Sequence, residues 1–270
     1  IAFWSFPSLF TAAAQQDLAE YEREATVITK ECKPENKSKS LSLDDIIMLS
    51  GWVSDKKSIC RGRFIGVNNS DLIEKSLEDT ITFDAKKSSI ISKYNVSYLS
   101  GDVVIKYNNN TISANKACFY SKKGEGNIAY AEGKVVFSRK NLLVLADSVL
   151  WYAKGGEYLS NAFFKLDAPS RGVGAGWGIA QKIWSPEAGS LSFVNSSYSY
   201  CAVDNPDWVL DAGYLEIDTL NKQGFASNLY FKFFGVPIFY FPLFSFPLSP
   251  DRKSGFLYPK INYSDTGGWN

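Results

Sequence analysis

A repeat of about 32 residues constrains the fold of this chain more than any other feature. The sequence Gly-Asp-Val-Val-Ile at 101–105 recurs as Gly-Lys-Val-Val-Phe at 133–137. An apolar-x-Ala-x-x-apolar unit also recurs, at spacings of 32, 34 and 32 residues. Its alanines are Ala114, Ala146, Ala180 and Ala212, with a weaker copy at Ala85. A period of this length is typical of stacked supersecondary units, none of which buries its apolar face alone.

Each repeat contains short β-branched segments in which apolar and polar residues alternate, as at 103–107. Turn-forming residues separate these segments at 108–110 and 122–126. Helical periodicity is not visible between 80 and 230. We therefore predict an all-β fold, a coil or folded-over sheet of stacked short strands with two facing sheets.

The composition excludes several classes of function. The net charge of +1 gives no basic field for a nucleic-acid partner. Histidine is absent from the sequence, which removes Ser-His-Asp and Cys-His catalysis and the usual imidazole zinc sites. The four cysteines lack C-x-x-C spacing, so we predict no metal and no cofactor. Carboxylate or Ser-Lys catalysis is not excluded, but no spacing singles out such a pair.

The first 79 residues differ from the repeat. Residues 1–14 are apolar and end in small residues, which is typical of the end of a secretory signal peptide; a buried first strand or helix is the alternative. Residues 15–79 form an amino-terminal extension, partly flexible, with a helical turn at 41–48 for which Ser42 is a candidate cap. A signal peptide would place the cysteines in an oxidising compartment, where four cysteines allow three full pairings.

An aromatic stretch at 229–248 is long enough to cross a bilayer as a helix. Pro237 and Pro242 oppose that conformation, because each proline inside a helix costs about 3 kcal/mol. An extended path along a membrane or a barrel rim fits the prolines. The aromatic rings are of the kind that collect at the lipid interface.

Short motifs in and around this stretch resemble one family in order and spacing. They are Cys201, Pro-Asp-Trp at 206–208, Ala212, Ile-Asp at 217–218, Gly-Val-Pro at 235–237, Phe-Ser-Phe-Pro-Leu at 244–248 and Arg-Lys-Ser-Gly-Phe-Leu at 252–257. The chain resembles the LptD family of outer-membrane lipopolysaccharide-assembly proteins, densely over 198–260 and more loosely upstream. Gly-Trp-Val at 51–53 with Cys60 resembles the cysteine-bearing segment near the mature amino terminus of that family.

The resemblance implies an architecture and a location. Residues 80–235 would form an open periplasmic β-jellyroll whose interior is a lipid groove. Residues 236–270 would form the junction with an outer-membrane β-barrel, whose first strand would lie at 255–263. The implied function is non-enzymatic transport and assembly of lipopolysaccharide at the outer membrane.

The resemblance also implies partners. An LptA-like periplasmic bridge would dock on the strand edge at 80–120, since an open jellyroll leaves unpaired edges. An LptE-like lipoprotein would bind through the barrel. The implied ligand is the lipid A portion of lipopolysaccharide, whose acyl chains would lie in the groove.

We expect the groove to be lined by the apolar positions of the repeat, although a register error of one residue would invert the choice. These positions are Val104, Ile112, Ala114, Val136, Val144, Ala146, Val149, Phe163, Ile179 and Leu210. An ordinary closed core is the alternative. Pro237 and Pro242 lack amide donors. We expect the junction to have few hydrogen bonds there and to open as a gate for lipid.

The resemblance matches Cys60 and Cys201 to two family cysteines that pair with partners near the end of the barrel, outside this chain. Cys32 and Cys118 depart from the family pattern. Cys118 lies in a predicted strand, where a cysteine is more often a small buried residue.

Two other functions stay open at this stage. A soluble periplasmic lipid carrier of LptA type would share the jellyroll but has no use for the aromatic, proline-rich stretch. A carbohydrate-active enzyme on a β-solenoid would need carboxylates aligned on one face. The nearest candidates are Asp147, Asp211 and Asp218, and their spacing does not align them convincingly.

Overall fold

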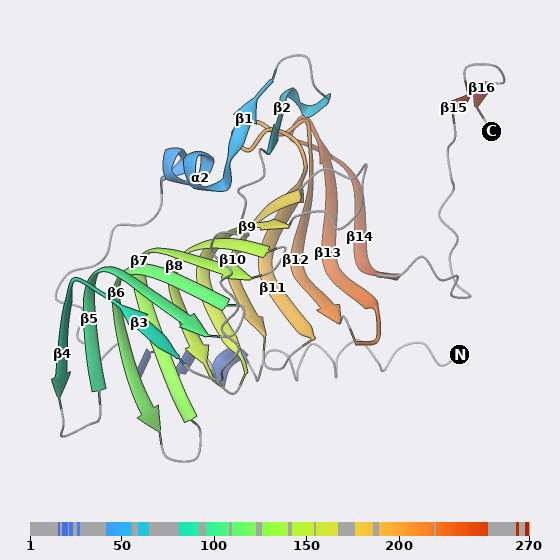
Figure 1. Cartoon of the computed structure of the whole chain (residues 1–270). Coiled ribbons are helices and arrows are strands. Elements are labelled where there is room, and N and C mark those ends of the chain that lie inside the picture. Colours follow the sequence, from blue (N-terminus) through green and yellow to red (C-terminus); the bar gives the residue numbers. More distant parts are fainter. Residues whose placement is uncertain are drawn as a thin grey trace, which may run out of the picture.

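The computed structural model describes the chain in segments, and the largest are strands (Figure 1). The described residues are 42–55, 59–64, 81–91, 96–107, 110–122, 126–139, 142–153, 155–166, 176–185, 189–218, 220–247, 263–264 and 268–269, with isolated positions between 16 and 27. The predicted signal remnant, Cys32 and most of the predicted first barrel strand lie outside these residues.

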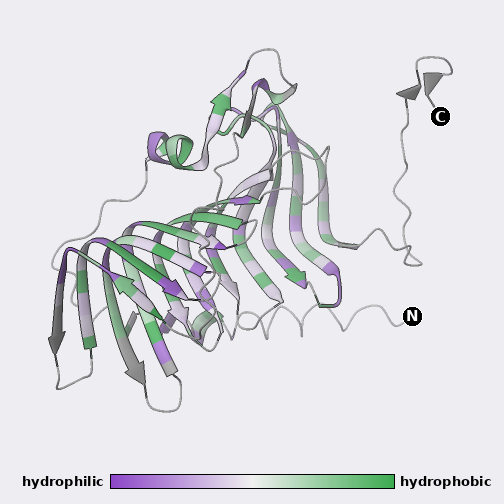
Figure 2. Ribbon diagram, viewed as in Figure 1, coloured by the Kyte–Doolittle hydropathy of each residue, from purple (hydrophilic) through white to green (hydrophobic). Residues whose placement is uncertain are grey.

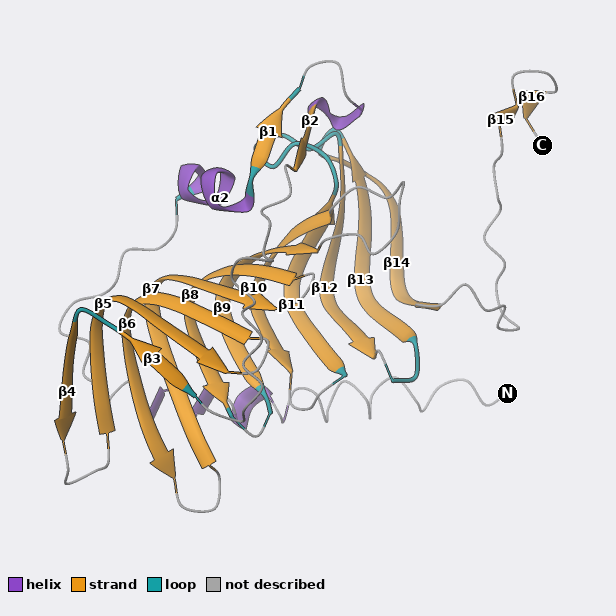
Figure 3. Cartoon of the chain, in the orientation of Figure 1, coloured by secondary structure: helices purple, strands orange, loops and turns teal. Residues whose placement is uncertain are grey.

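The described residues contain helix α2 (Leu43–Ser50), the 3-10 turn η1 (Ile59–Arg61) and a series of strands, drawn in Figure 3. The strands are β1 (Trp52–Ser54), β2 (Gly62–Phe64), β3 (Thr82–Asp84), β4 (Lys87–Ile91), β5 (Val96–Tyr107), β6 (Asn110–Lys122), β7 (Gly126–Arg139), β8 (Leu142–Tyr152), β9 (Glu157–Leu166), β10 (Gly176–Ser185), β11 (Ser190–Ser199), β12 (Trp208–Asp218), β13 (Gln223–Phe233), β14 (Val236–Pro247), β15 (Tyr263–Ser264) and β16 (Gly268–Trp269).

Twelve strands form one open antiparallel sheet whose order in space follows the chain. The order runs from β14 through β13, β12 and so on to β5 and β3, and β4 also pairs with β5. The predicted all-β fold is therefore confirmed. Antiparallel pairing throughout the described sheet contradicts the β-solenoid alternative, because solenoid rungs pair in parallel.

Each long strand bends near its middle, so the sheet folds over on itself (Figure 1). The bend in alternate strands contains a residue with positive φ: Asp102, Lys134, Asn161, Asn195 and Asn228. The pairing register also shifts there, as between Ser100 and Val103. An extra residue of this kind is a β-bulge, which bends a strand and increases its twist. The predicted facing sheets are thus the two halves of one sheet.

We call these halves the first arm and the second arm. The first arm contains 82–84, 103–107, 110–114, 135–139, 142–146, 162–166, 176–180, 196–199, 208–212, 229–233 and 236–241. The second arm contains 87–91, 96–100, 116–122, 126–132, 148–152, 157–160, 182–185, 190–194, 214–218, 223–227 and 243–247.

The bend explains the period of the sequence repeat. One repeat is a pair of antiparallel strands, and strands β5 to β14 are 10 to 14 residues long. They are longer than predicted because each crosses the bend, and only the halves are short. The repeated alanines are buried beside the bend, where Ala146 pairs with Val135 and Ala180 with Ala162. A methyl side chain fits this crowded line, and Ala85 occupies the matching place between β3 and β4.

The two arms enclose the main apolar cluster. Buried side chains of both arms form it, including Val103, Phe137, Val149 and Leu159. Aromatic pairs connect the arms directly: Phe83 with Phe119, Tyr107 with Trp151, and Phe164 with Phe193, with ring centroids 4.5, 5.4 and 5.0 Å apart. Hydrophobic residues recur in bands along the strands, as Figure 2 shows.

The outer surfaces of the arms carry separate clusters. On the first arm, Leu143, Leu145, Phe163 and Trp177 pack against the segment 42–64, which we call the strap. On the second arm, a cluster around Trp184 packs against Leu18. The capping box of α2, in which Ser42 and Asp45 exchange hydrogen bonds, confirms the predicted helix start and cap.

Candidate functional site

Half of the predicted groove residues lie on the inner surface between the arms. Ile112, Ala114, Val144, Ala146 and Val149 all belong to the enclosed apolar cluster and are nearly inaccessible to water. Leu210 lies farther along the sheet, partly buried beside Ala212 in a smaller cluster. These positions give the interior its apolar character.

The other predicted groove residues lie on the outer surface, which corrects the prediction. Val136 and Phe163 pack in the cluster beneath the strap, and Ile179 is 47% exposed. Val104 alternates with Val103 and Ile105, both of which face inward. Two consecutive valines of a strand cannot both face the interior.

In each repeat, the bulge determines which of the alternating side chains face the interior. The first valine after Gly-Asp or Gly-Lys faces inward, so the interior gains residues that the sequence prediction missed. They are Val103, Ile105, Val135, Phe137, Phe164 and Ile183. The glycine before each of the first two bulges, with φ of 78° at Gly101 and 79° at Gly133, is the sequence signal that could have placed the bend.

Burial of the inner surface decreases along the sheet. From β5 to β11 the inner residues are almost fully buried. On β12, Leu215 and Ile217 are only partly buried. On β14, side chains of both faces are exposed, including Ile238, Phe239, Tyr240 and Phe241. The interior is therefore closed at one end and accessible toward the edge strand β14.

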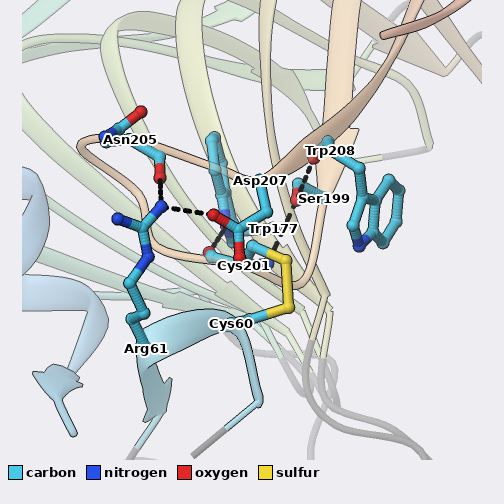
Figure 4. Close-up of a disulfide and its surroundings, with 8 residues drawn as sticks. All are labelled: Cys60, Arg61, Trp177, Ser199, Cys201, Asn205, Asp207 and Trp208. Atoms are coloured by element: carbon cyan, nitrogen blue, oxygen red, sulfur yellow. Dashed lines mark hydrogen bonds and ion pairs between the residues drawn. A yellow bond between two sulfur atoms is a disulfide. The ribbon is translucent and has the colours of Figure 1, made fainter. Parts of the chain in front are cut away.

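A disulfide attaches the strap to the loop before β12. Cys60 and Cys201 are bonded to each other (Figure 4), which corrects the prediction that both pair outside this chain. The two residues are separated by 141 positions, and sequence spacing offered no sign of the pairing. Cys118 is buried in β6 and is also disulfide-bonded.

Polar contacts surround this disulfide (Figure 4). The Arg61 guanidinium donates to the Asn205 carbonyl at 3.0 Å and forms an ion pair with Asp207. Trp177 Nε1 donates to the Cys201 carbonyl at 2.7 Å. Ser199 Oγ donates to the Trp208 carbonyl at 2.7 Å. The Pro-Asp-Trp motif thus belongs to the loop that anchors the strap.

Two lysines of the sheet make further contacts with the strap. The buried Lys165 Nζ donates to the Ser50 carbonyl at 3.2 Å and lies 5.3 Å from the centre of the Phe64 ring. Lys134 Nζ donates to Asp45 Oδ1 at 2.8 Å. The hydrogen bond from Lys134, with those from Ser42, lowers the pKa of Asp45 to about 2. The strap is therefore bonded to the sheet at both ends.

The predicted junction is an edge strand. Residues Val236–Pro247 form β14, which confirms the extended path predicted from Pro237 and Pro242. Pro237 pairs with Lys232 where the register of the pair β13–β14 is irregular. Proline is tolerated at a sheet edge because its missing amide leaves no inner partner unsatisfied. No residue from Val236 to Pro247 is charged.

The carboxylates considered for an enzyme lie apart and have structural contacts. Asp147 accepts from Asn161 Nδ2 at 2.9 Å, and Asp211 pairs with Lys232 at 2.6 Å. Asp218 accepts two backbone amides of the turn before β13. Within the described segments, no group of three or more acidic or cysteine side chains is arranged to hold a metal ion. Those segments also contain no helix with the length and hydropathy to cross a membrane.

Comparisons with known proteins support the family resemblance. The LPS-assembly protein LptD of Cupriavidus necator is 38% identical over 95 residues, which are 35% of this chain and 12% of that protein. The Coxiella burnetii protein of the same name is 36% identical over 93 residues, 34% of this chain and 11% of that protein. That of Methylococcus capsulatus is 40% identical over 78 residues, 29% of this chain and 8% of that protein. The matched segment thus spans about a tenth of these relatives, and no family model matches the chain.

One solved structure resembles part of the fold. It is LptH of Pseudomonas aeruginosa, described as the LptA-homologous periplasmic component of the lipopolysaccharide transport device. The TM-score is 0.34 at 16% identity, and the match covers 39% of this chain and 75% of that chain.

Proposed function

We propose that this chain is part of an LptD-like protein that assembles lipopolysaccharide at the outer membrane. Lipopolysaccharide enters from a periplasmic bridge, moves with its acyl chains between the two arms, and leaves toward a barrel. The chain acts without catalysis. The observation that carries this proposal is the continuous apolar surface between the arms, which runs across the sheet and becomes accessible near β14. The similarity to LPS-assembly proteins supports the choice of ligand.

The energetics explain why such an interior is needed. Burial of one methylene contributes about 0.8 kcal/mol, so a single acyl chain resists exposure to water by on the order of 10 kcal/mol. A lipid with several chains therefore needs a continuous apolar path. The inner surface of this sheet supplies one, while the polar sugars stay outside.

The closed end must open for this path to be used. Inner side chains such as Val135 and Val149 have no exposed surface. An acyl chain can reach them only when the arms separate. Hinge-like separation is compatible with a sheet whose strands all bend along one line, because the bulges already interrupt the hydrogen-bond ladder there.

The two edges of the sheet suit different partners. Strands β3 and β4 form one edge, where an LptA-like bridge would add its own strands. Strand β14 forms the other edge and leads to residues 248–270, where we place the start of a barrel that would itself bind an LptE-like lipoprotein. Pro237 and Pro242 would keep the seam between interior and barrel open to lipid. We place the folded sheet in the periplasm, where its disulfide is stable.

A soluble carrier of LptA type is the weaker proposal. Strand β14 exposes apolar side chains on both faces, including Phe239 and Tyr240. A carrier that diffuses through water gains nothing from such an edge, and a large exposed apolar patch typically marks an interaction site. A barrel wall or a membrane leaflet would cover it.

In-cell photo-crosslinking tests the proposed path. A photoreactive phenylalanine analogue at Phe137 or Phe193 on the inner surface is expected to capture lipopolysaccharide in cells with active transport. The same analogue at Asn115 or Ile179, on the outer surface, is the matched control and is expected to capture none. Capture at the outer positions alone, or at neither set, would reject the path between the arms.

A further inference from the structure

An ion pair closes the mouth between the tips of the two arms. Arg139 is the last residue of β7 and lies at the tip of the first arm. Glu157 is the first residue of β9 and lies at the tip of the second arm. Arg139 Nη2 donates to both carboxylate oxygens of Glu157, at 2.9 and 3.0 Å. The pair therefore connects the arms at the mouth from which the headgroup of a lipid held between them would project.

Both charged side chains face the interior rather than the outer surface. Arg139 follows Phe137 by two residues, and Glu157 precedes Leu159 by two, and both of these apolar residues belong to the enclosed cluster. The Glu157 side chain is 5% exposed, whereas that of Arg139 is 38% exposed. The guanidinium is thus the water-facing member of the pair, at the edge of the enclosed apolar cluster.

The surroundings hold the guanidinium in place. Its Nε donates to Asn110 Oδ1 at 2.8 Å, and its central carbon lies 5.4 Å from the centre of the Phe137 ring. Beside it, the edge-on contact of Tyr107 with Trp151 also joins the two arms. Arg139 therefore keeps a fixed position on the first arm even without its carboxylate partner.

The ionised form of the Glu157 carboxylate is disfavoured by its burial. Burial raises the pKa of Glu157, and the Arg139 charge only opposes that rise. A buried ion pair often contributes little net stability, because desolvation offsets the attraction. Arg139 can therefore exchange Glu157 for another anion once the arms separate and water reaches the released carboxylate.

We propose that Arg139 is an anion-binding site for the phosphate of an acylated ligand, and that Glu157 occupies this site when the interior is empty. The proposal rests on the proposed function, because acyl chains between the arms place the lipid headgroup at this mouth. A guanidinium binds phosphate oxygens with the same paired geometry as carboxylate oxygens. Phosphate exchange would break the bond between the arms as the ligand enters.

Binding of two lipids to the purified full chain tests this assignment. The probes are lipid A bearing two phosphates and the same lipid A after chemical dephosphorylation. We expect the unaltered chain to bind the phosphorylated form about tenfold more tightly, the equivalent of ~1.4 kcal/mol. Arg139→Gln is expected to lose this preference while it still binds the dephosphorylated lipid. Glu157→Gln is expected to bind the phosphorylated lipid more tightly than the unaltered chain.

Controls separate this proposal from the proposed function. Lys232→Gln breaks an ion pair with Asp211, on the outer side of β12 and β13, and is expected to leave both affinities unchanged. If Arg139→Gln does not fold, the result for Glu157→Gln decides, since no gain in phosphorylated-lipid affinity would overturn the anion site. Equal affinities of the unaltered chain for the two lipids would also overturn it and leave the lipid path intact. Absence of binding to either lipid would overturn both.

Discussion

The two ends of the sheet are built from the same repeat but differ in what covers them. From β5 to β11 the arms pack on each other through aromatic pairs such as Phe164 with Phe193. The strap covers the outer surface of the first arm from β7 to β10. From β12 to β14, aromatic contacts run along or between neighbouring strands, as in Tyr230 with Tyr240, and exposure rises. A shared strand pattern therefore does not decide whether a surface becomes core or binding site.

Strand β14 has the composition of a contact surface rather than of an edge that faces water. A strand of a soluble sheet alternates polar and apolar residues, because one face meets solvent. Strand β14 is apolar on both faces and has no charged residue. Few edge strands that face solvent share these two properties. The closed end buries its apolar side chains between the arms, whereas the open end leaves those of β14 exposed.

The largest expected effect comes from truncation of one aromatic side chain at each end. Phe137→Ala removes a side chain that is 1% exposed and should lower the free energy of unfolding by about 3–5 kcal/mol. Phe239→Ala, at the open end, should lower it by less than about 1 kcal/mol. Urea unfolding of the two variants under the same conditions measures both. Similar losses in the free energy of unfolding would contradict the proposed difference in packing between the closed and open ends.

Removal of the strap disulfide should give the next largest effect. The double variant Cys60→Ser with Cys201→Ser opens a covalent link between residues 141 positions apart. We expect a loss of about 2–4 kcal/mol in unfolding free energy, because the unfolded chain gains conformational freedom. Thermal unfolding without reductant is the measurement. An unchanged transition would mean that the noncovalent contacts of Lys165 and Arg61 hold the strap alone.

Substitution of the two prolines of β14 should have a small effect on stability and a larger one on transport. Pro237→Val with Pro242→Val restores amide donors and should raise the unfolding free energy by less than about 1 kcal/mol. We expect slower delivery of lipopolysaccharide to the cell surface, because the restored amide donors would hold the seam closed with additional hydrogen bonds. Surface labelling of lipopolysaccharide over time is the assay. Unchanged delivery would mean that the two prolines have no role in transport and are only tolerated at the edge of the sheet.

The smallest expected effect is a pH dependence of the strap. The folded pKa of Asp45 is about 2, below the ordinary value of 3.8, so its ionised form favours the folded state. That contribution is present above pH 3.8 and is lost as the pH falls through the folded value of about 2. Comparison of the unaltered chain with Asp45→Asn across this window should show convergence of their urea midpoints at the acidic end. A constant difference would assign the effect to helix capping instead.

The sequence was sufficient for the strands but not for their faces. The alanine repeat correctly predicted a folded-over β structure, because alternation and turn residues are local signals. The inward face depends on the bulges at Asp102 and Lys134, each of which shifts the alternation, so Val104 and Val136 were assigned wrongly. Only the glycine before each of these bulges marks it in the sequence.

Contacts between distant segments had no local signal. Lys165 and Ser50 are 115 residues apart, and the pattern around either residue gives no reason to join them. The pairing of Cys60 with Cys201 was likewise hidden, since a family resemblance pointed to partners elsewhere. Arg139 and Glu157 lie on different arms, and only the fold of the sheet brings their charges together.

A distance measurement tests directly whether the two arms separate when lipid binds. Spin labels attached through a ketone-bearing amino acid at Leu142 and Tyr152 would mark the two tips of β8 in the closed end. Labels at Gln223 and Phe233 would mark the two ends of β13 in the open end. We expect lipopolysaccharide to lengthen the distance between the labels in β8 and to change the distance in β13 little. An unchanged distance in β8 with lipid bound would contradict this expectation and leave the interior a closed core.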